Sequence, residues 1–387
     1  MKIGVIAIKR LVGILLILIL CTLLSGCWNY RGLNKLSIVT GVAVDRKDDN
    51  NYQLTMETVD LTAASKESAG KSQIIQSEGK TMFEAIRNAK KRVTKKLYFS
   101  DMKVLVVSNQ IAREEGIKSI LDFFMRDAEP RETVIPIISQ EKTAKEIFAA
   151  SGVDAKIISE ELQKMIDKDS ETTASTRKIA NYQVFNMLQG EKEMSLVMPA
   201  VHLVLNNEKK VVEVNGIAIF KADKLKGYLS PEDTHYYLFT VDEVKGGILT
   251  FPSNEKNQKW YDDLSFEIAK NKTKRSYSYD GNRLKFILDI KTTAVLDEVG
   301  ADIDVIKKEN IEKIKSTADR VFTDRLESVI KKEQIEFGCD IFGIGTMIHK
   351  SNPLLWSQLK ENWEYYIQTM EVEVRPEFLI INTGLEK

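Results

Sequence analysis

The residue with the most specific chemistry in this sequence is a cysteine near the N-terminus. Cys27 follows the small residues of Leu24-Ser25-Gly26, and these close an almost unbroken apolar run that begins at Leu11. Basic residues precede that run at Lys2, Lys9 and Arg10. A basic start, a short apolar core and small residues before the cleavage point are typical of a secretory signal peptide. The run is shorter than the roughly 20 residues that a membrane-spanning helix needs.

Small residues ending in a cysteine also match the bacterial lipobox, in which the thiol receives diacylglycerol and the cysteine becomes the new N-terminus. We therefore expect residues 1–26 to be a lipoprotein signal peptide and Cys27 to carry the lipid. Two or three acyl chains would anchor the mature chain stably, since each buried CH₂ group contributes about 0.8 kcal/mol. The alternatives are an ordinary signal peptide with an incidental cysteine, and an uncleaved anchor helix.

The remaining reactive side chains form no catalytic or metal-binding pattern. The three histidines lie far apart and outside any zinc-ligand motif, at His202, His235 and His349. We expect each to be a surface residue or a core histidine with its hydrogen bonds satisfied. Gly343-Ile344-Gly345 lacks the third glycine of a dinucleotide-binding loop, and no G-x-S-x-G motif is present. The sequence therefore predicts a protein that is not an enzyme and holds no metal or cofactor.

The overall charge argues against a nucleic acid partner. The 387-residue chain has 56 basic and 56 acidic residues, and removal of residues 1–26 leaves 53 basic against 56 acidic. A nearly neutral chain offers no electrostatic attraction for a polyanion. With Cys21 lost in the signal peptide and Cys27 lipidated, only Cys339 remains in the mature sequence. We therefore expect no intramolecular disulfide, so packing alone must hold the fold together.

Two charged clusters could mediate contact with a membrane or a partner protein. The first is basic and contains Lys90, Lys91, Arg92, Lys95 and Lys96. One interpretation is the solvated face of an amphipathic helix. The other is contact with anionic lipid headgroups or with an acidic loop of a partner, since each Lys or Arg near a membrane contributes about 1 kcal/mol. We hypothesise that this helix faces the membrane or integral-membrane partners, with Lys91 and Lys95 as contact residues.

The second cluster is a tight turn with mixed charges, Arg126-Asp127-Ala128-Glu129-Pro130-Arg131. It could simply end a helix, with local ion pairs that each contribute less than about 1 kcal/mol. Alternatively, its four charged residues could form an interface with a partner or with another part of the chain. Those residues are Arg126, Asp127, Glu129 and Arg131.

Strands and helices must alternate along the chain to position these clusters. Thr81-Met82-Phe83-Glu84 has the pattern of a capping box, which begins a helix. In the second half, Leu264–Lys270 and Leu284–Val295 alternate with period two, which predicts an antiparallel pair of strands with one solvated face. Asn310–Gln334 repeats apolar residues at helical spacing. The alternation of the two patterns indicates an α+β fold.

Several segments resemble one family in order from the lipobox to the last strand. They are Cys27-Trp28-Asn29-Tyr30-Arg31, the strand from Ile38 to Asp45, the stretch from Leu121 to Arg131, Gly216 to Lys221, and Lys245-Gly246-Gly247. In these segments the chain resembles the Ger(x)C family, the lipoprotein C subunits of spore nutrient germinant receptors. Two mild departures are Asn29, where the family usually has an acidic residue, and Tyr228, where it often has Trp.

The resemblance implies a non-enzymatic receptor subunit without a cofactor. It would lie on the outer face of the inner spore membrane, beside integral-membrane A and B subunits, and assemble or couple the complex by protein–protein contact. The resemblance also implies three mixed α/β domains, each a small sheet flanked by helices, behind the signal peptide. We place these domains at residues 27–199, 200–262 and 263–387.

A second class of function stays open. A solute-binding lipoprotein that captures a small nutrient directly would need a deep cleft with a few convergent polar groups. Binding of a small germinant to the purified protein would favour that alternative over the receptor subunit.

Overall fold

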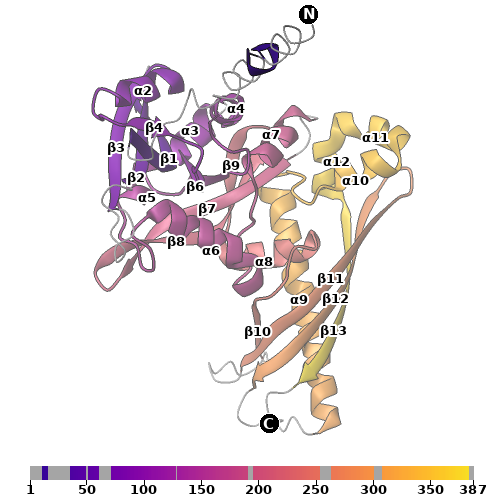
Figure 1. Ribbon diagram of the computed structural model, residues 1–387. Coiled ribbons are helices and arrows are strands. Elements are labelled where there is room, and N and C mark those ends of the chain that lie inside the picture. Colours follow the sequence, from indigo (N-terminus) through magenta and orange to yellow (C-terminus); the bar gives the residue numbers. More distant parts are fainter. Residues whose placement is uncertain are drawn as a thin grey trace, which may run out of the picture.

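The computed structural model describes residues 11–15, 35–48, 51–60, 71–127, 129–190, 195–252, 263–299 and 307–382. Residues 11–15 are helical, while Cys27 and the rest of the predicted signal peptide lie outside the described residues. In the described parts of the chain, no helix is both long and apolar enough to cross a membrane. The other described residues form two sheets with helices packed on them, coloured from indigo to yellow in Figure 1.

The larger sheet contains every described strand up to Leu229. Its order is β3 (Lys71–Gly79), β2 (Asn51–Asp60), β1 (Leu36–Asp48), β5 (Val104–Ser108), β6 (Ile135–Ser139), β7 (Ser195–Asn206), β8 (Lys209–Lys221) and β9 (Lys224–Leu229). A further short strand, β4 (Lys96–Tyr98), pairs with β1. The central strands β1, β5, β6 and β7 are parallel, and both ends of the sheet are antiparallel. Parallel neighbours need crossover connections, which the helices between them supply.

Helices cover both faces of the larger sheet. One face packs against α2 (Met82–Ala89), α3 (Asn109–Glu114), α4 (Lys118–Arg126) and α7 (Asn181–Gln189). The other face packs against α5 (Lys145–Phe148) and α6 (Ile158–Thr172). Every residue of β5 and β6 is buried, because strands covered on both faces have no solvated side.

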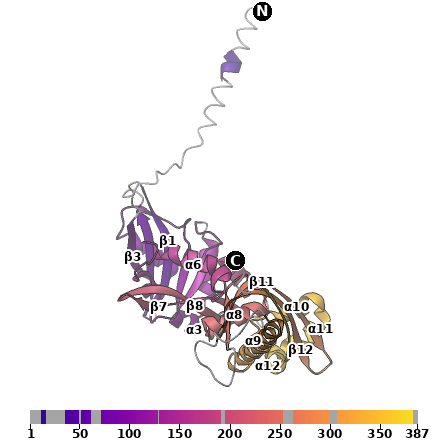
Figure 2. The same cartoon turned by 90° about the horizontal axis from the view of Figure 1, so that it is seen from below.

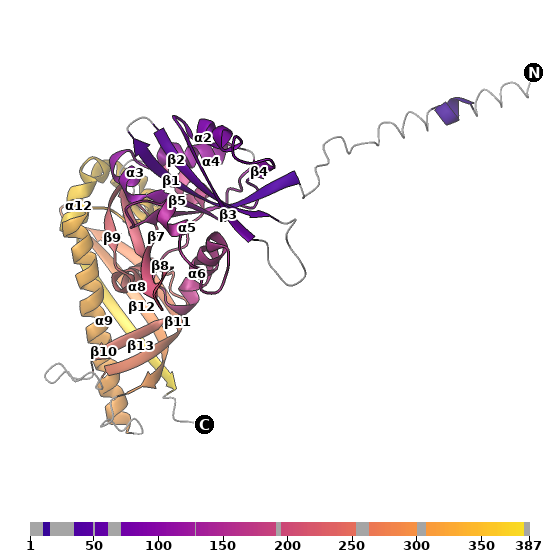
Figure 3. The same ribbon diagram turned by 90° about the vertical axis from the view of Figure 1, so that its left-hand side faces the viewer.

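The smaller sheet belongs to the C-terminal half, with the order β10 (Ile248–Pro252), β11 (Asp263–Tyr279), β12 (Leu284–Glu298) and β13 (Glu371–Asn382). The long helix α9 (Lys308–Glu336) packs on one face and follows the strands in Figures 1 and 3. Residues alternate between buried and more exposed along β12, which confirms the expected solvated face. Ring contacts run from Phe239 to Phe322 and on to Phe378, with centroids 4.8 and 5.2 Å apart.

Short helices cap one end of the C-terminal half. They are α10 (Ile344–Ser351), α11 (Pro353–Leu359), the 3-10 helix η3 (Lys360–Asn362) and α12 (Trp363–Thr369). The buried rings of Trp356 and Trp363 pack edge to face with centroids 4.9 Å apart. The Asp340 carboxylate accepts hydrogen bonds from the amides of Ile344 and Gly345 at 3.0 and 2.7 Å. An acidic residue at this position is stabilised by the partial positive charge at the start of α10.

Strand β8 contributes side chains to the cores of both halves. The helix α8 (Pro231–Thr240) also connects the halves, and it lies between β8 and α9 in Figure 2. Ala218 and Phe220 of β8 belong to the core beneath α2, α3, α4 and α7. Ile217 and Ile219 belong to the core of the C-terminal half. This division follows from the period of a strand, in which successive side chains point to opposite faces.

The mixed α/β architecture with sheets flanked by helices is confirmed. The helix predicted to begin at Thr81 is also present, since Thr81 Oγ1 accepts a hydrogen bond from the Glu84 amide at 3.1 Å.

The boundary predicted between residues 199 and 200 lies inside β7, and the larger sheet continues across it. Pro199 sits beside a bulge in the β7–β8 register, where a missing N–H group is tolerated. The boundary predicted between residues 262 and 263 lies just before β11, which pairs with β10. The division into three domains stays a prediction.

Candidate functional site

The last residue of the basic cluster lies beside the first residue of β1, and it contacts the mixed-charge turn. β4 pairs with β1 in parallel register, which places Lys96 opposite Leu36. Lys96 also forms an ion pair with Glu129 of the turn, 33 residues later in the sequence. Figures 1 and 3 show α2, α4 and β4 gathered at this end of the larger sheet. The structure therefore joins the two charged clusters in one surface, which we call the β4 surface.

The basic part of the β4 surface begins where α2 ends. Lys90, Lys91 and Arg92 are exposed, whereas Lys95 is half-buried. The guanidinium group of Arg92 donates a hydrogen bond to the carbonyl oxygen of Gln76 in β3. This contact holds the segment after α2 against the sheet, and Lys91 of that segment is exposed to the solvent.

The mixed-charge turn follows α4. Arg126 forms an ion pair with Asp122, one turn earlier in the helix, at 2.8 Å. Asp127 ends the helix, and its carboxylate accepts a hydrogen bond from the Glu129 amide at 3.1 Å. Arg131 is exposed. Arg126, Asp127 and Glu129 thus stabilise the shape of the turn, and Arg131 presents a positive charge outward.

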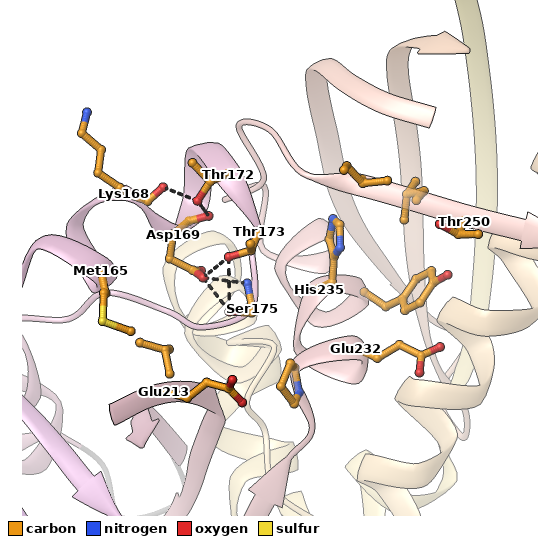
Figure 4. Close-up of a pocket in the computed structure, with 15 residues that line it drawn as sticks. Met165, Lys168, Asp169, Thr172, Thr173, Ser175, Glu213, Glu232, His235 and Thr250 are labelled. Atoms are coloured by element: carbon orange, nitrogen blue, oxygen red, sulfur yellow. Dashed lines mark hydrogen bonds between the residues drawn. The ribbon is translucent and has the colours of Figure 1, made fainter. Parts of the chain in front are cut away.

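A cavity of about 710 Å³ lies between the two halves of the molecule. Its wall comes from α6 and the turn after it, from β8, from α8 and from β10, so both sheets contribute. Figure 4 shows His235 and Glu232 of α8 across the cavity from Lys168 and Asp169 of α6. Its volume lies within the roughly 300–1,000 Å³ that is common for small-molecule sites.

Asp169 places a fixed carboxylate in the wall of the cavity. It accepts hydrogen bonds from the hydroxyl groups of Thr173 and Ser175, both at 2.6 Å. It also accepts from the amides of Ser175 and Thr176 at 3.1 and 2.8 Å. A buried carboxylate is stable when several donors satisfy it, and these donors also shape the turn that ends α6.

The Lys245-Gly246-Gly247 turn, one of the segments that suggested the family, connects α8 to β10 close to the end of α6. The Lys245 amide donates a hydrogen bond to the carbonyl oxygen of Ser170 at 3.1 Å. A Cβ atom on Gly246 would lie 2.3 Å from the carbonyl oxygen of Glu171, and Gly247 has a φ of +111°. The close approach and the positive φ both favour glycine, so this turn sets the distance between the halves beside the cavity.

His235 is buried at the cavity, and its Nε2 has no hydrogen-bond partner among the described residues. Its ring stacks on Phe239 with centroids 5.5 Å apart, and burial lowers its pKa to about 4. The expectation of a surface or fully hydrogen-bonded histidine is therefore wrong at this position. Sequence reasoning missed it because every residue from Thr234 to Thr240 is buried, so no apolar stripe marks the inner face of α8.

The other reactive side chains make local contacts. Among the described residues, no group of three or more His, Cys, Asp or Glu side chains is placed to hold a metal ion. His202 bonds to Glu213 at 2.9 Å, and His349 stacks on Trp356. Cys339 is buried as a free thiol, and burial raises its pKa, which disfavours the reactive thiolate.

Each half of the chain matches a family model of spore germination proteins. Residues 29–203 match the family described as "Spore germination protein N-terminal domain", and residues 215–384 match "Spore germination B3/ GerAC like, C-terminal". The chain is 23% identical over 401 residues to "Spore germination protein KC" of Bacillus subtilis (strain 168), which covers 98% of this chain and 97% of the relative. It is 23% identical over 367 residues to "Spore germination protein B3" of the same strain, covering 93% of this chain and 95% of the relative.

The fold also has a counterpart among solved structures. The structure described as "Crystal Structure of the GerBC protein" matches with a TM-score of 0.58 at 19% sequence identity, over 88% of this chain and 97% of that one. The two family matches follow one another along the chain and together span most of it. The chain therefore belongs to the Ger(x)C family of spore germination proteins, the C subunits of germinant receptors.

Proposed function

We propose that this chain is a non-enzymatic, lipid-anchored subunit of a nutrient germinant receptor, held by Cys27 on the outer face of the inner spore membrane. Family membership supports a role in spore germination. In this proposal the chain contacts integral-membrane A and B subunits, and that contact assembles the receptor or couples its parts.

The register between β1 and β4 gives the proposal its strongest support. Eight residues separate Cys27 from Leu36, the first residue of β1. Even when fully extended, this tether spans no more than about 30 Å. Lys96 lies directly opposite Leu36 in the sheet. A lipid on Cys27 would therefore keep the β4 surface within reach of the bilayer and of proteins embedded in it.

The side chains of the β4 surface suit contact with anionic headgroups. The residues that follow α2 are basic and exposed, and each such side chain near a charged bilayer contributes about 1 kcal/mol. On α2 itself, the ring of Phe83 is 54% exposed, and the Arg87 guanidinium lies 4.8 Å from its centroid. Exposed aromatic rings beside basic residues are typical of helices at a membrane interface. In the proposal, Lys91 and Lys95 contact headgroups or an acidic loop of a partner.

The mixed-charge turn would form the protein-binding part of the same surface. Its internal contacts fix its shape before binding, so little conformational entropy is lost when a partner docks. Arg131 would then supply the outward charge, and Arg126, Asp127 and Glu129 would position it. Spores with Asp127→Ala and Arg131→Ala that germinate normally would exclude this interface.

Spores carrying Cys27→Ala test the anchor. We expect them to lose the response to one class of nutrient and to keep calcium–dipicolinate germination, because the receptor would lack this subunit at the membrane. The variant protein should also shift from the membrane fraction to the soluble fraction, since no acyl chain would hold it. A variant that remains in the membrane fraction with every nutrient response normal would contradict the lipid anchor.

Charge reversal tests the β4 surface. Lys91→Glu with Lys95→Glu should lower the recovery of this chain with receptor-containing membranes at least about tenfold, because two favourable contacts of about 1 kcal/mol each become repulsive. Lys308→Glu with Lys313→Glu is the matched control. It makes the same change in charge at the start of α9, at the opposite end of the molecule from α2 in Figures 1 and 3. Unchanged assembly in the Lys91 and Lys95 variant would exclude the contact.

A further inference from the structure

The outer edge of β3 has backbone groups that no described strand pairs with. β3 comes last in the order of the larger sheet, and it lies at the left-hand edge of that sheet in Figure 1. Along a strand, the N–H and C=O groups of successive residues point alternately to its two sides. The Thr58 hydroxyl group of β2 donates a hydrogen bond to the Gln73 carbonyl oxygen at 3.2 Å, so Gln73 faces β2. The backbone groups of its neighbours Ser72 and Ile74 therefore point outward, where another extended chain can pair with them.

Two side chains from α2 and the segment after it cover the far end of this edge. The guanidinium group of Arg92 donates a hydrogen bond to the Gln76 carbonyl oxygen. The side-chain amide of Asn88 donates one to the Glu78 carbonyl oxygen at 2.8 Å. Covering an edge in this way prevents a further strand from pairing with it. The open part of the edge therefore precedes the Gln76 carbonyl group, which limits where an added strand can align.

A small, mainly apolar hollow lies beside the open part of the edge. Its volume is about 180 Å³, and its lining includes Ile74 and Gln76 of β3 with Phe148 and Ala149 at the end of α5. The Ile74 side chain is 45% exposed. The hollow is smaller than the roughly 300–1,000 Å³ of small-molecule sites, so it suits one side chain rather than a whole ligand. When a peptide adds a strand to a sheet, backbone hydrogen bonds supply the affinity and such hollows receive alternate side chains.

Positive charge borders the open edge. Lys145 lines the hollow and Arg92 lies on the edge, and neither forms an ion pair with a described residue. Glu146 also lines the hollow, but its carboxylate already accepts hydrogen bonds from the amide and the hydroxyl group of Thr143 at 3.1 and 2.7 Å. Both cations therefore favour an incoming segment that carries carboxylates.

We propose that β3 binds an acidic, extended segment of a partner protein, which adds a strand to the larger sheet. The segment pairs with the outward backbone groups of Ser72 and Ile74, and one of its apolar side chains enters the hollow beside Phe148. Its carboxylates lie near Arg92 and Lys145. This site is separate from the β4 surface, and it rests on the proposed function only because a partner in the receptor would supply the strand.

Fluorescence anisotropy tests the site with a labelled peptide and the full-length chain in nonionic detergent micelles. The probe is the peptide Glu-Val-Glu-Leu-Glu-Val-Glu, and we expect saturable binding with a Kd below about 1 mM. One control peptide has the same side chains but carries methyl groups on the alternate backbone amides that would face β3. The other, Lys-Val-Lys-Leu-Lys-Val-Lys, reverses the charge. Each control should bind at least about tenfold more weakly, since one loses the backbone hydrogen bonds and the other is repelled. No saturable binding of the acidic peptide, or equal binding of either control, overturns the proposal.

Ile74→Pro tests the edge itself. Proline removes the outward N–H group, and it is tolerated where that group points away from the sheet. This variant should bind the acidic peptide at least about tenfold more weakly, because proline removes a hydrogen bond and its ring crowds the added strand. Ile74→Val keeps the N–H group and should bind as the natural sequence does. Equal affinity of the two variants overturns the proposal.

Ala149 offers a second pair of variants that remains informative if Ile74→Pro does not fold. It is exposed and lines the hollow. Ala149→Trp fills the hollow and should weaken binding of the acidic peptide at least about fivefold, because the apolar side chain of the peptide loses its place. Ala149→Ser leaves the hollow open and should not change the affinity. Equal affinity of these two variants overturns the proposal.

The peptide measurement needs neither the lipid nor the other receptor subunits, so its failure overturns strand addition alone. The proposed function is decided separately, by Cys27→Ala and by Lys91→Glu with Lys95→Glu. A second copy of the chain is the other possible source of a strand. Self-association that Ile74→Pro abolishes, measured by sedimentation of the chain in the same micelles, would assign the edge to that second copy and overturn the proposal.

Discussion

At the scale of single residues, two buried ionisable side chains make stability depend on pH in opposite directions. Burial lowers the pKa of His235 to about 4, so the folded protein holds it neutral above that pH. Glu333 of α9 is fully buried, and both carboxylate oxygens lack a hydrogen-bond partner among the described residues. Burial raises its pKa to about 8, so it is protonated in the folded protein at neutral pH. Each residue therefore binds protons differently in the folded and unfolded states.

Replacing His235 by Phe should remove a loss of stability at acidic pH. In the unfolded chain the imidazole titrates near 6.5 and takes up a proton that the folded state accepts only near pH 4. The unfolded state thus binds more protons between these values, and the free energy of unfolding falls by on the order of 3 kcal/mol as the pH drops through this range. Urea unfolding at pH 7 and pH 5 measures the effect. An equal loss in the natural sequence and in His235→Phe would contradict the lowered pKa.

Glu333→Gln tests a pH dependence of stability that has the opposite sign to that of His235. The folded state keeps the carboxyl proton up to about pH 8, whereas the unfolded state releases it above about 4.5. Stability is therefore lost as the pH rises from about 4.5 to about 8. The substituted amide cannot ionise, so urea unfolding should show this variant becoming progressively more stable than the natural sequence across that range. A stability difference that stays constant between pH 5 and pH 8 would contradict the raised pKa.

The spacing of apolar residues predicts that Glu333 is buried, but it gives no such indication for His235. Glu333 follows Val329 by four residues and Ile330 by three, so helical spacing places it on the buried stripe of α9 rather than on its charged face. His235 lies in a helix buried on every side, where spacing cannot distinguish an inner face. The unsatisfied Nε2 depends on residues distant in the sequence, which spacing does not reveal.

At the scale of elements, one glycine in β8 should be much less tolerant of substitution than another in the β11–β12 turn. Gly216 has a φ of +76°, and a Cβ there would lie 1.9 Å from the carbonyl oxygen of Leu229 in β9. Gly281 has a φ of +97° with open space around it. Gly281→Ala should cost about 1 kcal/mol from its left-handed backbone alone. Gly216→Ala should cost at least about 1 kcal/mol more, since β9 must also move.

Denaturant midpoints at equal slope compare the two glycine variants. Similar losses of stability in both would mean that β9 shifts away from β8 without cost. Such a result would contradict the close β8–β9 pairing as a constraint on residue 216.

The helices and strands that the sequence predicts are those whose apolar residues recur at a regular spacing. The elements that it does not predict lack such a spacing. The predicted strand pair and long helix correspond to β11, β12 and α9. β3 is an edge strand rich in Ser and Gln, so no apolar run marks it. The predicted boundary between residues 199 and 200 falls inside β7 at Pro199, because a proline inside a strand normally argues against that strand. The bulge that accommodates this proline depends on pairing with β8, which the local sequence does not show.

At the scale of the whole molecule, the two halves should unfold in one transition. β8 contributes to the cores of both halves. Arg177 bonds to Glu243 at 2.8 and 2.6 Å and to the hydroxyl group of Tyr237 at 3.1 Å. Far-UV circular dichroism reports on all secondary structure. Three of the four tryptophans, Trp260, Trp356 and Trp363, belong to the C-terminal half of the sequence, so tryptophan fluorescence reports mainly on that half. We expect the two signals to give coincident denaturation curves.

Arg177→Met should lower the shared midpoint without separating the two signals, because the apolar contacts along β8 remain. The expected loss is on the order of 2–3 kcal/mol, since Glu243 would lose its charged partner in a partly buried position. A dichroism change that precedes the fluorescence change would show that the halves unfold independently.

The shared strand also bears on how the chain reaches its folded state during synthesis. Ile217 and Ile219 pack in a core that includes Phe378, about 160 residues later in the sequence. At roughly 5–20 residues per second, the ribosome needs about 10 to 30 s to make the intervening segment. Throughout that interval α8 can pack on this strand face, but the part of the core that β13 supplies is missing. A chain cut short before β13 would keep that core incomplete permanently, so we expect nonsense mutations near the C-terminus to make the N-terminal half a target for chaperones and proteases.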